Sequence, residues 1–138
     1  MSPTQRTLTQ LKHEGFFCRV VEKWNPYARI RQDLWGADII ALRQGSPTIL
    51  IQCTTQSNAA ARIHKVCAIP EVAVWVGNGG IFQVWGWRKI KRGNRHLWEV
   101  DKRPITLEVL SQHRRLIESG EIPKVDDDGE DGEDLHPA

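Results

Sequence analysis

Residues 37–54 read ADIIALRQGSPTILIQCT, two apolar runs separated by a turn. The turn signal is Gln44-Gly45-Ser46-Pro47, because Gly and Pro close together interrupt regular structure. The flanking runs, Ala37–Arg43 and Thr48–Thr54, are rich in Ile and Leu and have the length of strands. This stretch therefore predicts two adjacent strands joined as a hairpin.

Polar side chains lie at one end of this predicted hairpin. Strand alternation puts Gln52 and Thr54 on one face of the second strand, and Cys53 on the other. Asp38, near the start of the first strand, then comes close to Gln52. A carboxylate beside an amide oxygen can hold a hard cation such as Mg²⁺, and the backbone carbonyl of Cys53 is a further candidate ligand. The alternative is structural, with Asp38 capping a strand and Gln52 a satisfied buried amide.

The segments around the hairpin have recognisable patterns of their own. We expect a helix over residues 4–14, a strand over 16–24 and a polar, Arg-rich connection over 25–36, in which Asp33 is either a loop residue or an outer metal ligand. A helix capped by Ser57 or Asn58 is expected to run to about residue 69, where Pro70 ends it. Strands over 71–76, 81–89 and 96–100 and a helix over 106–117 complete the prediction. The connection from residue 54 to residue 72 is long enough to cross over to a parallel strand.

This order resembles the core of the PD-(D/E)XK nuclease superfamily. The resemblance covers roughly residues 4–76 and lies in a helix, an Asp opening a hairpin strand, a polar-x-polar triplet on the next strand and a basic helix. It is most similar to small Holliday-junction-resolvase-like and virus-type nuclease domains. The resemblance implies an α/β fold with a restriction-endonuclease-like αβββαβ core, a mixed central sheet, and additional C-terminal strands and a helix.

The resemblance also assigns roles to individual residues. Glu14 matches the acidic residue of the first helix, Asp38 the metal-binding aspartate, and Gln52 the (D/E) position, which some branches fill with Gln. Asp38, Gln52 and the Cys53 carbonyl would hold Mg²⁺ or Mn²⁺, with Glu14 contributing directly or through water. Thr54 occupies the Lys position, a departure, because Thr cannot supply the charge that positions or activates the attacking water. Lys65, on the following helix, is either a migrated catalytic lysine or an ordinary exposed one.

The charge of the chain is segregated. Residues 1–120 contain 18 Lys or Arg and 9 Asp or Glu, whereas residues 121–138 contain one Lys and 8 Asp or Glu. These counts correspond to +9 and −7, and to the net charge of +2. We expect a domain over 1–120 that favours an anionic partner, DNA above all, and a disordered acidic tail over 121–138. The tail either competes with DNA for the basic surface or serves solubility.

Basic residues are the candidate nucleic-acid contacts. They are Arg29, Arg31, Arg62, Arg88, Lys89, Lys91, Arg92 and Arg95. Trp85 and Trp87 lie on one face of a predicted strand, just before the basic residues that begin at Arg88. They either stack on unpaired bases or pack against the last helix or a dimer partner.

Other features place the protein in a broad class. The three cysteines are irregularly spaced, which indicates free thiols in a reducing compartment, and the five His show no ligand or nucleophile pairing. No apolar run approaches the roughly 18–20 residues that span a membrane, and the N-terminus lacks a signal-peptide pattern. We expect a cytoplasmic protein without a membrane partner, with a homodimer left open.

Two functions follow from the residues. The first is a metal-dependent DNA endonuclease, structure-specific or resolvase-like. The alternative is a catalytically inactive nuclease-fold module that binds nucleic acid or protein, which Thr54 at the Lys position allows. Metal-dependent cleavage of DNA separates the two.

Overall fold

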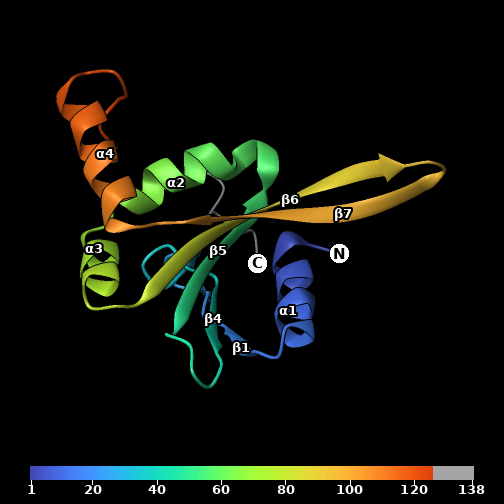
Figure 1. The fold of residues 1–138 in the computed structure, drawn as a ribbon. Helices are drawn as coiled ribbons and strands as arrows, with labels where there is room; N and C mark the ends of the chain where they lie inside the picture. Colours follow the sequence, from blue (N-terminus) through green and yellow to red (C-terminus); the bar gives the residue numbers. More distant parts are fainter. Residues whose placement is uncertain (126–138) are drawn as a thin grey trace.

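A computed structural model describes residues 1–125 of the chain. Most of the predicted acidic tail, residues 126–138, lies outside the described residues. The helices and strands of the described part are, in chain order, α1 (Pro3–His13), β1 (Phe17–Val20), β2 (Lys23–Asn25), β3 (Ile30–Gln32), β4 (Ile39–Leu42), β5 (Ile49–Thr55), the 3₁₀ helix η1 (Gln56–Asn58), α2 (Ala59–Cys67), α3 (Pro70–Gly77), β6 (Ile81–Arg92), β7 (Arg95–Pro104) and α4 (Leu107–Glu118) (Figure 1).

Five of the strands form one mixed sheet, in the order β1-β4-β5-β6-β7, and β2 and β3 form a separate hairpin. β4 pairs antiparallel with β1 and with β5, whereas β5 and β6 run parallel. A parallel pair needs a long crossover connection, which α2 and α3 supply between β5 and β6. The predicted α/β fold with a mixed central sheet is confirmed, as is the hairpin within residues 37–54.

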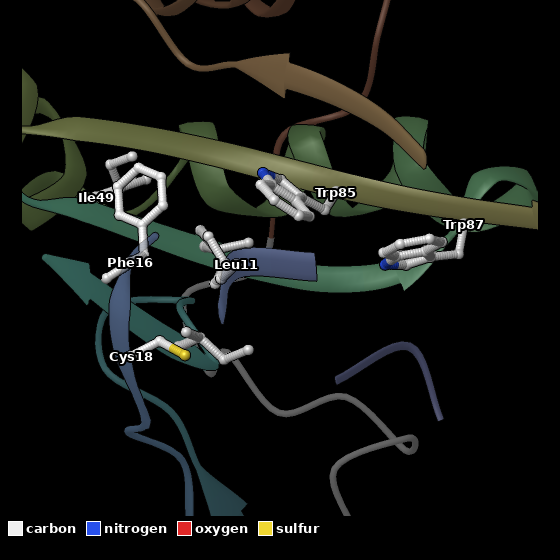
Figure 2. Packing of buried hydrophobic residues seen from close by; sticks show 9 residues of the cluster. Leu11, Phe16, Cys18, Ile49, Trp85 and Trp87 are labelled. Carbon is white, nitrogen blue, oxygen red and sulfur yellow. The ribbon is translucent and has the colours of Figure 1, made fainter. Parts of the chain in front are cut away.

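The sheet buries an apolar cluster on each face, because successive side chains of a strand point to opposite sides. On one face, which we call the α1 face, Leu11 of α1 packs with Ile39, Ile51 and Trp85 (Figure 2). On the other, the α2 face, Leu50 packs with residues of the helices; the buried members of that cluster are Ala37, Leu50, Ala59, Val66, Val72, Phe82, Val84 and Ile105. Side chains at even-numbered positions of β5 therefore point toward α2.

Trp85 and Trp87 belong to the α1 face. They are 1% and 6% exposed, and the Trp87 indole N–H donates to Thr7 Oγ1 of α1 at 2.9 Å. Of the two roles predicted for Trp85 and Trp87, packing is therefore confirmed and base stacking is wrong. The packing partner is the first helix rather than the last one, because both side chains point to the face that α1 covers (Figure 2).

Residues 71–76 form helix α3, and the predicted strand is wrong. A short continuous apolar run does not distinguish a buried strand from a buried helix by its periodicity. Pro70 occupies the first helical turn, where its missing N–H costs no hydrogen bond, and it follows an extended Ile69. The parallel strand next to β5 is β6, which begins eleven residues after Pro70.

The predicted strand over 16–24 is divided, and the predicted connection over 25–36 contains β3. β1 ends at Val20, and the N–H of Val21 donates to the Asp38 carbonyl. The chain then turns back on itself between β2 and β3, because the Asn25 side chain accepts hydrogen bonds from the backbone N–H groups of Tyr27 and Ala28. This hairpin brings Arg31 back toward the start of β4.

β6 and β7 form a long hairpin whose far half projects from the body (Figure 1). The predicted strands over 81–89 and 96–100 lie within it, and β7 is an edge strand, as expected. Thr106 caps α4 by accepting a hydrogen bond from the N–H of Val109, also as expected. Within residues 1–125, no helix is long and apolar enough to cross a lipid bilayer.

Candidate functional site

Asp38 and Gln52 lie side by side on the α2 face, at the end of the β4–β5 hairpin opposite its turn. The Gln52 amide Nε2 donates to Asp38 Oδ2 at 2.9 Å, and both residues are buried. The register is set by the N–H of Asp38, which donates to the carbonyl of Ile51 at 2.8 Å. The structure thus brings these two side chains together as the hairpin pattern predicted.

The Asp38 carboxyl is held by a second donor, the backbone N–H of Cys53, which also donates to Oδ2 at 2.9 Å. Burial nevertheless raises the pKa of Asp38 to about 8, and the hydrogen bond from Cys53 opposes that rise only in part. Carboxylates nearby raise this pKa further, since like charges disfavour ionisation. At neutral pH the carboxyl is therefore largely protonated unless a cation compensates its charge.

Glu22 is the acidic neighbour that the sequence pattern missed. Its side chain hydrogen-bonds to Asp38, and its charge is one of the causes of the raised pKa of Asp38. Arg31 of β3 forms a 3.0 Å ion pair with Glu22. The hydrogen bonds from Gln52 and from the Cys53 N–H both go to Oδ2 of Asp38. Proximity of Glu22 to Asp38 depends on the break in pairing after Val20, for which the sequence carries no clear signal.

Asp33 lies at the rim of the same cluster. Its Oδ1 accepts the N–H of Gly36 at 3.0 Å, so part of its role is to shape the turn before β4. Partial burial of its carboxyl raises the pKa of Asp33, with a contribution from Glu22, whereas the charge of Lys65 lowers it. Lys65 of α2 is therefore near enough to Asp33 for its charge to act on that carboxyl. We call Glu22, Asp33 and Asp38 the acidic cluster.

The orientation of the Gln52 amide differs from the predicted one. Nε2 donates both to Asp38 Oδ2 and, at 2.8 Å, to the carbonyl of Gly36. A carbonyl can only accept, so Gly36 fixes the nitrogen of the amide on this side. Gln52 therefore holds the Asp38 carboxyl in place through its amide nitrogen, and its role as a metal ligand stays a prediction.

Glu14 is not part of the cluster, and its predicted contribution to a metal site there is wrong. Its carboxylate binds Lys102 at 2.8 and 2.9 Å, and the Lys102 amine lies over the Trp85 ring on the α1 face. Burial would raise the pKa of Glu14, but Lys102 and Gln10 outweigh it and lower the pKa. The helix that carries Glu14 covers the face of the sheet opposite to Asp38.

Cys53 and Thr54 are the middle and the last residue of the polar triplet. Thr54 is buried on the α2 face, two residues beyond Gln52. The Cys53 thiol points to the α1 face, where burial raises its pKa. The N–H of Cys53 points toward Asp38, and the carbonyl of a strand residue points to the same side as its N–H. The Cys53 carbonyl therefore points toward the edge that β4 leaves unpaired beyond Ile39.

The described residues contain no group of three or more His, Cys, Asp or Glu side chains arranged to hold a metal ion. Mg²⁺ does not require one, because it keeps several waters and is usually bound through one or two carboxylates together with substrate phosphates. Asp38 and Glu22 supply two carboxyl groups, and Glu22 is one of the causes that raise the pKa of Asp38. A divalent cation bound by both carboxyl groups would relieve their repulsion, so this pair fits a magnesium-type ion.

The predicted nucleic-acid contacts lie in three places. Five are on the projecting part of the β6–β7 hairpin, which we call the arm (residues 88–99): Arg88, Lys89, Lys91, Arg92 and Arg95. Arg88 pairs with Glu99 across the hairpin at 2.7 Å. Arg29 and Arg31 belong to the β2–β3 hairpin, where Arg31 pairs with Glu22, and Arg62 lies on α2, one turn before Lys65.

Two histidines that the sequence did not pair are in contact. His64 Nδ1 of α2 lies 2.6 Å from His113 Nε2 of α4, so the two rings share one proton. Burial, and then the neighbouring His64, lowers the pKa of His113. The pair ties α4 to α2 and lies apart from the hydrogen bonds of Asp38.

No family model, curated protein or solved structure matches this chain.

Proposed function

We propose that this chain is a metal-dependent nuclease with a restriction-endonuclease-like core, which hydrolyses phosphodiester bonds in DNA. The observation that carries the proposal is the buried contact between Asp38 and Gln52, 2.9 Å long, at the end of an antiparallel hairpin. The order of elements in the main sheet supports it, since α1, the antiparallel strands β1, β4 and β5, a helical crossover and the parallel strand β6 give αβββαβ once the separate β2–β3 hairpin between β1 and β4 is set aside. The PD-(D/E)XK superfamily, which the sequence resembles, has this order.

Asp38 and Glu22 are the residues that would hold Mg²⁺ or Mn²⁺, with the Cys53 carbonyl on the same edge. A divalent ion bound there would activate the attacking water and stabilise charge on the phosphate. Gln52 and the Cys53 N–H keep the Asp38 carboxyl in one orientation. Arg31 holds the Glu22 carboxyl in place through its 3.0 Å ion pair. Lys65, whose charge acts on Asp33, is the candidate for the positive charge that Thr54 lacks.

The arm supports DNA as the partner. Its cations alternate along a two-stranded ribbon, so that Lys89 and Lys91 point to one side and Arg92 to the other. Neutralising phosphates with such residues releases counterions and gives salt-dependent, sequence-independent affinity. A cytoplasmic location stays a prediction from the sequence, as does a homodimer.

Cleavage assays on single-stranded, duplex and branched DNA, with and without Mg²⁺ or Mn²⁺, test the proposal. The expected result is cleavage that requires the metal and disappears in Asp38→Asn. Asn is the matched variant because its amide reproduces the hydrogen bonds of a protonated carboxyl but carries no charge. Metal-dependent cleavage that survives this substitution, or none with any substrate, would contradict the proposal.

A second candidate is a nuclease-fold module that binds nucleic acid without cleaving it. Two features of the polar triplet favour it. Thr54, at the position of the superfamily lysine, is buried and uncharged, and Gln52 presents its nitrogen to Asp38. DNA binding by the parent chain that is insensitive to Mg²⁺, without cleavage of any substrate, would select this candidate.

A further inference from the structure

The turn before β4 carries a tryptophan in an unfavourable backbone conformation. Leu34 and Ala37 exchange two backbone hydrogen bonds, of 3.0 and 2.9 Å, around Trp35 and Gly36. Both central residues have positive φ, 52° at Trp35 and 86° at Gly36, which is the type I′ turn. Asn, Asp or Gly normally occupies the first of these positions, because a side chain is strained in the left-handed region. The turn itself therefore gives no reason for a tryptophan.

The turn is fixed to the candidate site. The carbonyl of Gly36 accepts from Gln52 Nε2 at 2.8 Å, and its N–H donates to Asp33 at 3.0 Å. A side chain at Gly36 would come within 3.0 Å of Ile69 and 3.2 Å of Val66, so the backbone packs directly against the last turn of α2 and the residue before α3. The residue after Trp35 thus contacts the same amide that holds the Asp38 carboxyl.

Trp35 is also exposed, at 41%, whereas Trp85 and Trp87 are buried in the core. An exposed indole on a left-handed backbone is unfavourable twice over, through strain and through apolar surface left in water. Strained residues of this kind gather at functional sites. An indole offers a flat apolar face, and bases stack on such faces irrespective of their sequence.

We propose that Trp35 is a stacking platform for an unpaired base of single-stranded DNA beside the Asp38–Glu22 pair. A base within a duplex is already stacked between its neighbours, so an indole at this position favours unpaired nucleotides. The inference rests on the proposed function for the position of the DNA backbone. Stacking itself needs neither a metal nor cleavage, so it is measured separately.

The direct test compares two single-stranded oligonucleotides of equal length, one with thymine bases and one with a central abasic segment. Their affinity for the full chain is measured by fluorescence anisotropy in the presence of a chelator. Because both carry the same phosphate charge, the difference reports on the bases. We expect the abasic strand to bind about 10-fold more weakly. Equal affinity for the two strands would overturn the proposal.

Three variants assign that difference to Trp35. Trp35→Asn should fold, because Asn suits the left-handed position, and should lose about 10-fold in affinity for the thymine strand but not for the abasic strand or a duplex. Trp35→Phe should keep most of the affinity. Phe17→Asn, at an 80% exposed aromatic near the other end of the β1–β4 pair, is the matched control and should change nothing.

The proposal would also be overturned if Trp35→Asn bound the thymine strand as tightly as the parent does. An equal loss of affinity for the thymine strand, the abasic strand and the duplex would overturn it too. Absence of cleavage by the parent chain would reject the proposed nuclease activity but leave the stacking platform standing.

Discussion

The two faces of the central sheet differ in how they treat acidic side chains. On the α1 face, the half-buried Glu14 carboxylate is neutralised by Lys102 and has a lowered pKa, next to an apolar cluster around Leu11 and Trp85. On the α2 face, Asp38 is buried next to another carboxyl and has a raised pKa. The first arrangement costs the fold little, because the two charges compensate each other, whereas the second lowers stability unless a cation binds. The difference favours the α2 face as the location of the proposed function.

The largest expected effect is on cleavage. Asp38→Asn should reduce metal-dependent cleavage by at least about 100-fold, because one of the two carboxylates that would hold the cation is removed. Glu14→Gln, the acid on the other face, should leave the rate within about 3-fold of the parent, as expected for a group outside the site. Rate constants measured under saturating Mg²⁺ check both. A loss in Glu14→Gln as large as that in Asp38→Asn would break the comparison between the faces.

The next effect is on stability and belongs to the α1 face. Leu11 is fully buried, so Leu11→Ala should lower the free energy of unfolding by about 2–5 kcal/mol. Phe17→Ala, at an exposed position of β1, should change it by less than about 0.5 kcal/mol. Urea denaturation followed by circular dichroism measures both values. Equal losses in the two variants would show that Leu11 does not belong to the core.

The pH dependence of stability should have opposite signs on the two faces. The pKa of Asp38 rises from 3.8 to about 8 on folding, so its contribution is complete below about pH 4 and is lost as pH rises toward 8. Asp38→Asn should therefore match the parent at acid pH and exceed it by about 1–3 kcal/mol at pH 8. Glu14 has a lowered pKa, so Glu14→Gln should be less stable than the parent at neutral pH, and the deficit should vanish as pH falls. Thermal melts across this range check the signs, and a destabilised Asp38→Asn at pH 8 would contradict them.

The hairpin and its register could be predicted because they depend on local signals. A Gly-Ser-Pro turn and alternating side chains are enough to place Asp38 opposite Gln52, and the structure has them 2.9 Å apart. The crossover was also predictable, since a parallel neighbour of β5 needs a long connection. The helix at residues 71–76 could not be predicted, because an apolar run of this length suits a buried helix as well as a strand.

The rest of the site depends on contacts between distant segments. Glu22 reaches Asp38 only because pairing with β4 ends at Val20 and β2 and β3 turn back together. The nitrogen of Gln52 faces Asp38 only because the Gly36 carbonyl lies next to it, which no spacing rule contains. The resemblance assigns Glu14 to the site, but the helix that carries it covers the other face. Chemistry-bearing residue types could be found from the sequence, whereas their partners could not.

The proposed function requires that a divalent cation binds at the buried Asp38 carboxyl. The most direct measurement is a pH titration of its side-chain carboxyl carbon by NMR, with Asp38→Asn used to assign the signal, in the absence and presence of Mg²⁺. We expect a midpoint near 8 without Mg²⁺ and a clearly lower midpoint with it, since a bound cation favours the ionised form. A midpoint near 3.8 without metal, or a raised midpoint that Mg²⁺ does not move, would contradict it.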